Sequence, residues 1–201
     1  RQVGGDFYDF FLLGDDLYFA IGDVSGKGIP ASLLMSYTIS LLRSFSFKPT
    51  SPSEIARFLN NRITERNEND LFVTFFIGVL NLKTGALNYC NAGHMPPVIT
   101  YPDRTCSFFD IQADLPLGIL TDHSYPEYSY HFSPGSGILL YTDGVTEAEN
   151  KERAFYTKER LLQIIHRNRE QHPREFIKEI MKDIQSHVQA YEQSDDLTLF
   201  T

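Results

Sequence analysis

The sequence predicts an α+β fold in which two antiparallel β-sheets pack together and helical layers lie outside them. Three observations support this fold class. The chain opens with two apolar segments joined by a tight turn, two helical patterns follow, and a long series of short β-like segments then fills the middle. Two further helical patterns and a last apolar segment close the chain. Because short turns join most of the β segments, antiparallel pairing is favoured over parallel winding.

The first strand pair is predicted at residues 6–13 and 17–22. Gly14-Asp15-Asp16 separates the two segments, and this composition is typical of a hairpin turn. A hairpin folds the chain back on itself, so the start of the first strand and the end of the second are expected to meet.

Two helices are predicted next, at residues 29–47 and 52–66. The first contains Pro30, which suits only the first turn of a helix. The second has a capping box, in which Ser51 is the N-cap and Glu54 reaches back to it. Its apolar residues have amphipathic spacing, as expected for a helix that covers a sheet.

The remaining strands begin with residues 72–80, which are apolar nearly throughout, as in a strand buried on both faces. Further strands are expected at 86–91, 98–101, 105–110, 127–132 and 137–142. Thr157 is expected to cap a helix and Pro173 to open another. Residues 197–201 then close the fold as a strand.

Length and composition indicate one globular domain over residues 1–201. The hydrophobic fraction of 42% and the charged fraction of 22% are those of an ordinary soluble protein. The formal net charge of −8 argues against a broad surface for nucleic acid or anionic membrane. No apolar run approaches the roughly 18–20 residues that cross a bilayer, so no membrane insertion is expected.

The cysteines and the first residue bear on the setting of the domain. Cys90 and Cys106 have no metal-type spacing and lie in strand-like runs, so we expect buried free thiols and a reducing cytoplasm.

The sequence begins at Arg1, without an initiating methionine, inside structured-looking sequence. We therefore expect a domain excised from a longer chain that carries an upstream regulatory module.

Acidic residues at four dispersed sites share one setting. Asp6, Asp23, Asp143 and the Asp195-Asp196 pair each lie at the edge of an apolar segment, next to glycine or another acidic residue. Ionised carboxylates are rarely buried without a partner, and four that converge would repel one another. Two divalent cations would balance four negative charges. We therefore expect four of these carboxylates in one small cluster around two metal ions.

The expected metals are Mg²⁺ or Mn²⁺, because all-oxygen coordination suits these ions better than zinc. Two such ions about 3.5–4 Å apart can activate a shared water and bind the oxygens of a phosphoryl group. This chemistry predicts hydrolysis of a phosphate ester by a metal-activated water, with no covalent enzyme intermediate.

A simpler interpretation exists for each acidic site taken alone. Aspartate and glycine are common at strand ends because they make turns, so a single site is more often a turn residue than a ligand. Asp9, Asp15 and Asp16 are interpreted as local or solvated residues of this kind. The prediction of a metal centre rests on the sites taken together.

Six short motifs occur in order along the chain: Gly4-Gly5-Asp6-Phe7-Tyr8-Asp9, Gly22-Asp23-Val24-Ser25-Gly26-Lys27-Gly28, Asn91-Ala92-Gly93-His94, Leu115-Pro116-Leu117-Gly118, Tyr141-Thr142-Asp143-Gly144-Val145-Thr146-Glu147 and Asp195-Asp196-Leu197-Thr198. With these motifs the chain closely resembles the bacterial PPM phosphatase domains of the sporulation stage II E and stress-regulator type, relatives of protein phosphatase 2C. The resemblance spans almost all 201 residues. It implies an αββα sandwich and a Mn²⁺- or Mg²⁺-dependent protein serine/threonine phosphatase.

The resemblance also implies roles for individual residues. Asp23 would bridge both metals, and the backbone carbonyl of Val24 would bind one of them. Asp143 and Asp195 would complete the sphere of the catalytic metal, with Asp196 as the second choice in that pair. Asp6 would hold the second metal directly or through water. Arg1 lies where relatives of protein phosphatase 2C carry a phosphate-binding arginine, whose guanidinium can grip phosphate with two hydrogen bonds.

The implied substrate is a phosphoserine in a STAS-type anti-anti-sigma protein, within a pathway of sigma-factor regulation and stress response. An N-terminal sensor or dimerisation module usually controls such domains through the helices after the Asp23 loop, which here are residues 29–47 and 52–66. A bacterial cytoplasmic location follows. Two other functions stay open: a catalytically silent module that docks a STAS-type or kinase partner, and an enzyme that acts on small phosphoesters with the same metals.

Other patterns do not support a different function. Gly4-Gly5-Asp6-Phe7 is similar to the start of a diguanylate cyclase signature, but an aromatic replaces its acidic fourth residue. Gly26-Lys27-Gly28 lacks the first glycine and the final hydroxyl residue of a Walker loop, so Lys27 is interpreted as solvated. His94 is interpreted as a hydrogen-bonded loop histidine, and Glu147 as a weaker candidate for orienting the Asp143 loop or a metal-bound water.

Overall fold

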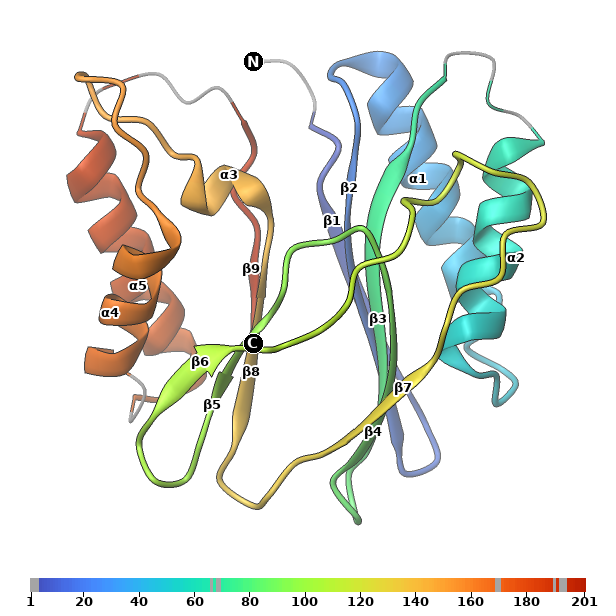
Figure 1. Ribbon diagram of the computed structural model, residues 1–201, viewed down its shortest axis with the longest axis horizontal. Helices are drawn as coiled ribbons and strands as arrows, with labels where there is room; N and C mark the ends of the chain where they lie inside the picture. The colour runs from blue at the N-terminus through green and yellow to red at the C-terminus, as the bar shows by residue number, and fades with distance from the viewer. Residues whose placement is uncertain (1–3, 66, 68–69, 169–170, 190, 192–194) are drawn as a thin grey trace. The chain divides into compact units, whose positions relative to one another are not determined.

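A computed structural model describes residues 4–65, 67, 70–168, 171–189, 191 and 195–201 of the chain. The chain divides into two compact units, each built on its own antiparallel sheet (Figure 1). The first unit contains Arg1–His94 and Ile111–Phe132, and the second contains Met95–Asp110 and Ser133–Thr201. Within the described residues, no helix combines the length and the apolar character that crossing a bilayer requires.

The sheet of the first unit has five strands in the order β1-β2-β3-β4-β7, and all neighbours are antiparallel. Helices α1 and α2 lie against one face of this sheet (Figure 1). The elements of the unit are β1 (Phe7–Leu13), β2 (Asp16–Val24), α1 (Ile29–Arg43), α2 (Pro52–Thr64), β3 (Val73–Asn81), β4 (Ala86–Ala92) and β7 (Tyr128–His131).

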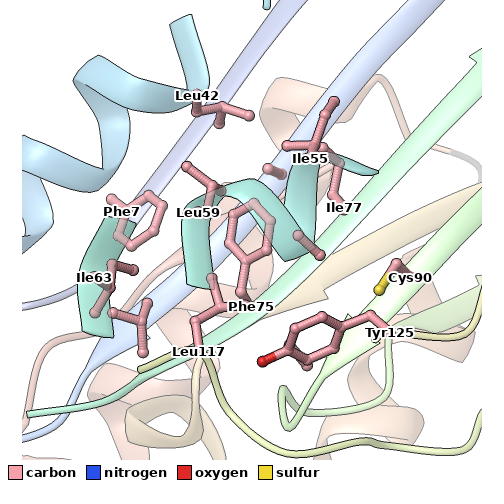
Figure 2. Packing of buried hydrophobic residues seen from close by; sticks show 14 of the residues in the cluster. Phe7, Leu42, Ile55, Leu59, Ile63, Phe75, Ile77, Cys90, Leu117 and Tyr125 are labelled. Atoms are coloured by element: carbon pink, nitrogen blue, oxygen red, sulfur yellow. The ribbon is translucent and has the colours of Figure 1, made fainter. Parts of the chain in front are cut away.

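The core of the first unit lies between its sheet and its two helices. Phe75 and Ile77 of β3 meet Leu59 and Ile63 of α2, and all four side chains are almost completely buried (Figure 2). Each fully buried side chain of this size stabilises the fold by about 1.5–3 kcal/mol. The amphipathic spacing of α2 therefore reflects packing against the sheet, as the sequence predicts.

Local signals fix the ends of the helices in the first unit. The capping box at α2 is present, with Ser51 Oγ accepting a hydrogen bond from the Glu54 N–H at 3.3 Å and Glu54 Oε2 accepting from the Ser51 N–H at 3.3 Å. Helix α1 begins after Gly28 at φ 80°, and its proline lies in the first turn. It ends at Arg43, earlier than the predicted residue 47, and turns follow.

The second unit has a four-stranded sheet in the order β6-β5-β8-β9 and three helices. Helices α4 and α5 contribute half of the buried residues of its core, in which Tyr141, Leu161, Ile165 and Ile180 are each at most 1% exposed. The elements are β5 (Val98–Thr100), β6 (Cys106–Phe108), β8 (Gly137–Tyr141), α3 (Asp143–Thr146), α4 (Lys158–Asn168), α5 (Pro173–Val188) and β9 (Leu199–Phe200).

A polar network joins α4 to α5. Arg160 donates to both carboxylate oxygens of Asp183, at 2.9 and 3.2 Å, and Tyr156 donates to Asp183 at 2.6 Å. The hydrogen bonds from Arg160 are the largest influence that lowers the pKa of Asp183 below its ordinary value. The network holds the two helices of the second unit in one register.

The α+β class with two antiparallel sheets and flanking helices is confirmed. The predicted strands and long helices are all present, with shifts of a few residues at their ends, the largest of them at the C-terminal end of α1. The short helix α3, which starts at Asp143, was not predicted. Its four residues are too few to show a helical period.

The interpretation of Asp9 as a local or solvated residue is wrong. In β1, Asp9 shares the face of Phe7 and Phe11 toward the helices, and it is 7% exposed. Its Oδ1 accepts hydrogen bonds from the Arg43 guanidinium and, at 2.9 Å, from the Phe10 N–H. A buried carboxylate needs such partners, because removing an ion from water is costly.

Candidate metal centre

The β1–β2 hairpin brings two of the predicted ligands to one end of the first sheet. Phe7 pairs with Gly22, so Asp6 directly precedes this pair and Asp23 directly follows it. Phe7 lies on the face that packs against the helices, and side chains alternate along a strand. Asp6 and Asp23 therefore point to the opposite face. The predicted meeting of the two strand ends is confirmed.

The loop after Asp23 is tied to the start of β3. The Ser25 N–H donates to the carbonyl of Phe72 at 2.9 Å, and the Phe72 N–H donates back to Ser25 Oγ at 2.8 Å. Gly26 has a φ of 83°, which favours glycine. Through these contacts the turn holds Asp23 and Val24 at a defined position at the head of α1.

A glycine is also required beside the Val24 carbonyl. A Cβ atom on Gly5 would lie 2.8 Å from the Val24 carbonyl oxygen, closer than real Cβ contacts allow. The chain before Asp6 thus passes directly over the backbone of β2. Any side chain at position 5 would have to move the one backbone oxygen that the sequence predicts as a metal ligand.

The second unit brings together the other predicted ligands. The Thr142 N–H donates to the carbonyl of Thr198 at 3.2 Å, and the Thr198 N–H donates to Thr142 Oγ1 at 3.1 Å. A Cβ on Gly144 would overlap the backbone carbonyl oxygen of Asp196. These contacts hold the start of α3 against the residues that enter β9. Asp143 and the Asp195-Asp196 pair therefore lie in one neighbourhood.

Negative charge accumulates in this neighbourhood. Partial desolvation, followed by the charges of Asp143 and Asp195, raises the pKa of the Glu147 carboxyl above its ordinary value. The carboxylates of Asp143 and Asp195 therefore lie close enough to disfavour a further negative charge on Glu147. A bound cation would relieve this repulsion. Carboxylate and carbonyl oxygens are the donors that Mg²⁺ and Mn²⁺ prefer, so the residues present fit such an ion.

His94 is not one of the predicted ligands, but its ring contacts a residue that pairs with Asp23. Its Nδ1 is 2.9 Å from Thr74 Oγ1, and Thr74 is the cross-strand partner of Asp23. The interpretation of His94 as a hydrogen-bonded loop histidine is confirmed. Sequence reasoning missed Thr74, although it is the one hydroxyl residue in the apolar run at 72–80.

The predicted ligands belong to different units of the chain. Asp6, Asp23 and Val24 are in the first unit, whereas Asp143, Asp195 and Asp196 are in the second. Among the residues that the structure describes, no group of three or more His, Cys, Asp or Glu side chains is placed to hold a metal ion. The cluster of four carboxylates stays a prediction. Arg1 lies outside the described residues.

Comparisons with known proteins agree with the motifs. Residues 14–201 match the sequence family described as stage II sporulation protein E (SpoIIE). The phosphoserine phosphatase RsbU of Bacillus subtilis (strain 168) is 32% identical over 200 residues, which cover 99% of this chain and 59% of the relative. The chain therefore spans about three fifths of the length of that relative.

Solved structures share the fold. The crystal structure of the RsbU and RsbW domains of Rv1364c from Mycobacterium tuberculosis matches with a TM-score of 0.81 and 28% identity, over 98% of this chain and 54% of that one. A crystal structure of RsbX in complex with magnesium matches with a TM-score of 0.71 and 16% identity, over 99% of this chain and 90% of that one. The chain accordingly belongs to the SpoIIE family of PPM-type phosphatase domains.

Proposed function

We propose that the chain is a metal-dependent protein phosphatase that hydrolyses phosphoserine or phosphothreonine. The observation that carries the proposal is the placement of acidic side chains at strand ends: Asp6 with Asp23 in the first unit, and Asp143 with the Asp195-Asp196 pair in the second. Membership of the SpoIIE family, together with a relative named as a phosphoserine phosphatase, supports the same chemistry.

Two divalent cations, Mn²⁺ or Mg²⁺, are the proposed cofactors. Asp23 would be the ligand common to both ions, and the Val24 carbonyl would bind one of them. Asp143 and Asp195 would complete the sphere of the catalytic metal, with Asp196 as the alternative to Asp195, and Asp6 would hold the second metal directly or through water. When bound, such ions supply a water of lowered pKa and offset charge on phosphoryl oxygens. The proposal requires the first acidic group, Asp6 and Asp23, and the second acidic group, Asp143 with Asp195 or Asp196, to bind the same pair of ions.

The chain's own residues have separate tasks in this proposal. The turn fixed by Ser25 and Phe72 keeps the Asp23 carboxylate and the Val24 carbonyl at a constant spacing. The contact between Gly144 and the backbone of Asp196 does the same for the second group. Arg1 is the proposed phosphate-binding group, through paired hydrogen bonds from its guanidinium.

The proposed substrate is a phosphorylated STAS-type anti-anti-sigma protein, in a bacterial cytoplasmic pathway of sigma-factor regulation under stress. The support is the similarity to RsbU, a phosphoserine phosphatase, and the net charge of −8, which disfavours nucleic acid as a partner. A sensor or dimerisation module beyond the present sequence is the proposed source of control.

The test is a phosphatase assay with Mn²⁺ on a phosphoserine STAS protein and on a generic phosphoester. Asp23→Asn and Asp143→Asn are expected to reduce hydrolysis to background, and a chelator to do the same. Asp15→Asn is the matched control, because Asp15 lies at the other end of the same hairpin in an exposed ion pair with Lys83.

Each other outcome assigns a different function. Hydrolysis that survives both substitutions or the chelator refutes the metal mechanism. Activity on the small phosphoester alone favours a small-molecule phosphoesterase. Binding of the STAS protein without hydrolysis, in the presence of bound Mn²⁺, favours a catalytically silent docking module.

A further inference from the structure

A row of polar side chains crosses three strands at the end of the first sheet that carries Asp23. Asp6 precedes the Phe7–Gly22 pair of β1 and β2, and Asp23 pairs with Thr74 of β3. Directly paired residues of antiparallel strands project their side chains from the same face. Phe75 lies in the core on the helix side, so Thr74 points to the face that carries Asp23.

His94 is held next to this row by its ring. Its Nδ1 lies 2.9 Å from Thr74 Oγ1, and the residue is 4% exposed. The direction of this hydrogen bond depends on the tautomer of the imidazole. If Nδ1 carries the proton, it donates to Thr74 Oγ1, and the threonine hydroxyl then directs its own proton elsewhere.

The backbone around His94 is fixed from several sides. Asn91, which is 2% exposed, accepts from the His94 N–H at 2.8 Å and donates to the His94 carbonyl at 3.1 Å. Gly93 has a φ of 75°, and a Cβ there would lie 2.8 Å from Pro116 Cγ. These contacts fix the backbone of His94, and its buried ring can leave Thr74 only by giving up their hydrogen bond.

We propose that His94 and Thr74 form a positioning pair for the Asp23 carboxylate. The Nδ1–H group of His94 donates to Thr74 Oγ1, and the Thr74 hydroxyl donates to a carboxylate oxygen of Asp23. This chain of hydrogen bonds fixes the rotamer of Asp23, the residue assigned to bridge the two metals. The inference rests on the proposed metal centre, and neither residue of the pair touches a metal or a substrate in it.

The expected loss of Mn²⁺ affinity can be taken from other groups that orient metal ligands. Loss of such a group typically weakens metal affinity or activity 10- to 100-fold. Thr74→Val removes the hydroxyl and keeps the shape of the side chain, so we expect the Kd for Mn²⁺ to rise at least about 10-fold. Thr74→Ser retains the hydroxyl, and its Kd is expected to stay within about threefold of the parent value.

The experiment measures Mn²⁺ binding by calorimetry on the 201-residue chain, with urea unfolding of every variant. His94→Leu is expected to weaken Mn²⁺ binding as much as Thr74→Val, and His94→Asn, whose amide replaces the Nδ1–H donor, to restore part of it. The double variant Thr74→Val/His94→Leu should be no worse than either single variant, because residues that act as one unit are not additive. Thr38→Val is the control: Thr38 is a buried threonine that bonds only its own helix in the described contacts.

The outcomes separate this inference from the proposed function. Mn²⁺ binding that depends on Asp23 but is unchanged in Thr74→Val overturns the positioning pair and leaves the metal centre intact. Additive losses in the double variant, or losses of stability alone with unchanged Mn²⁺ affinity, also overturn it. A parent chain that binds no Mn²⁺ overturns the metal centre and the positioning pair together.

Discussion

Replacing Asn60 by leucine tests how α2 holds the segment that carries Leu117 and Gly118. Asn60 is fully buried in α2, and its side chain bonds residues about sixty positions later in the chain. Its Oδ1 accepts from the Gly118 N–H at 2.9 Å and from the Tyr125 hydroxyl at 3.2 Å, and its Nδ2 donates to the Leu120 carbonyl at 2.9 Å. One amide therefore satisfies three groups of that segment.

The expected loss follows from the groups left without a partner. Gly118 is buried, so its N–H would lose its bond without access to water, at about 1–3 kcal/mol. Leu120 is 53% exposed, so its carbonyl regains part of its bonding from solvent. Tyr125 keeps a second acceptor, the Pro116 carbonyl at 3.4 Å. We therefore expect Asn60→Leu to lower the free energy of unfolding by about 3 kcal/mol.

Urea unfolding measures this loss. The chain has no tryptophan, so circular dichroism and tyrosine fluorescence follow the transition, and the urea dependence (m) is expected to stay constant. Asn61→Leu is the matched control, because Asn61 is the next residue of α2 and its side chain bonds only Asn60 and the exposed Asp122 among its described contacts. Its expected loss is below about 1 kcal/mol. Equal losses for the two variants would refute the reasoning.

Three further substitutions or treatments have defined outcomes. Asp183→Asn should lower the free energy of unfolding by about 1 kcal/mol at pH 7, because solvent screens the partly exposed Arg160. Since Arg160 lowers the pKa of Asp183, this loss is present above about pH 4 and should shrink as the pH falls below it. Urea titrations at pH 7 and pH 3 can check this. Burial, with smaller contributions from Asp114 and Glu127, raises the pKa of the Cys90 thiol to about 12. A thiol reagent at pH 8 should therefore leave Cys90 unmodified in the native protein and label it after unfolding, as mass spectrometry would show. Rapid labelling of the native protein would contradict the burial of Cys90. Gly144→Ala places a methyl group against the backbone carbonyl oxygen of Asp196 and should weaken Mn²⁺ binding in calorimetry, whereas unchanged affinity would mean that this contact does not hold the second acidic group.

Features that depend on neighbouring residues could be predicted from the sequence. The capping box at Ser51 and Glu54 involves residues three positions apart, and the structure contains both of its hydrogen bonds. The β1–β2 hairpin has a short turn that sets its register, so the position of Asp6 beside Asp23 followed from counting residues. The alternation and spacing of apolar residues then gave the other strands and the long helices.

Features that depend on distant partners could not be predicted. Asn60 is a polar residue in an amphipathic helix, and only its bond to Gly118 explains its burial. Asp9 looked like one more turn aspartate, but Arg43, at the end of α1, lies against it. Thr74 acquires its significance from two tertiary facts, its pairing with Asp23 and its bond to His94. Sequence spacing contains no record of such contacts.

The contact between Phe7 and Gly22 has a consequence for how this domain can diverge. A Cβ on Gly22 would lie 2.5 Å from Phe7 Cζ, so the ring occupies the space that a side chain at position 22 would need. A side chain at position 22 would clash with the Phe7 ring, and a smaller residue at position 7 would leave a cavity beside Gly22. Gly22 directly precedes Asp23. Substitutions of the core residue Phe7 are therefore limited by the turn that carries Asp23. Homologous chains are therefore expected to change positions 7 and 22 together, and a library that randomises both should recover folded pairs that single-site libraries miss.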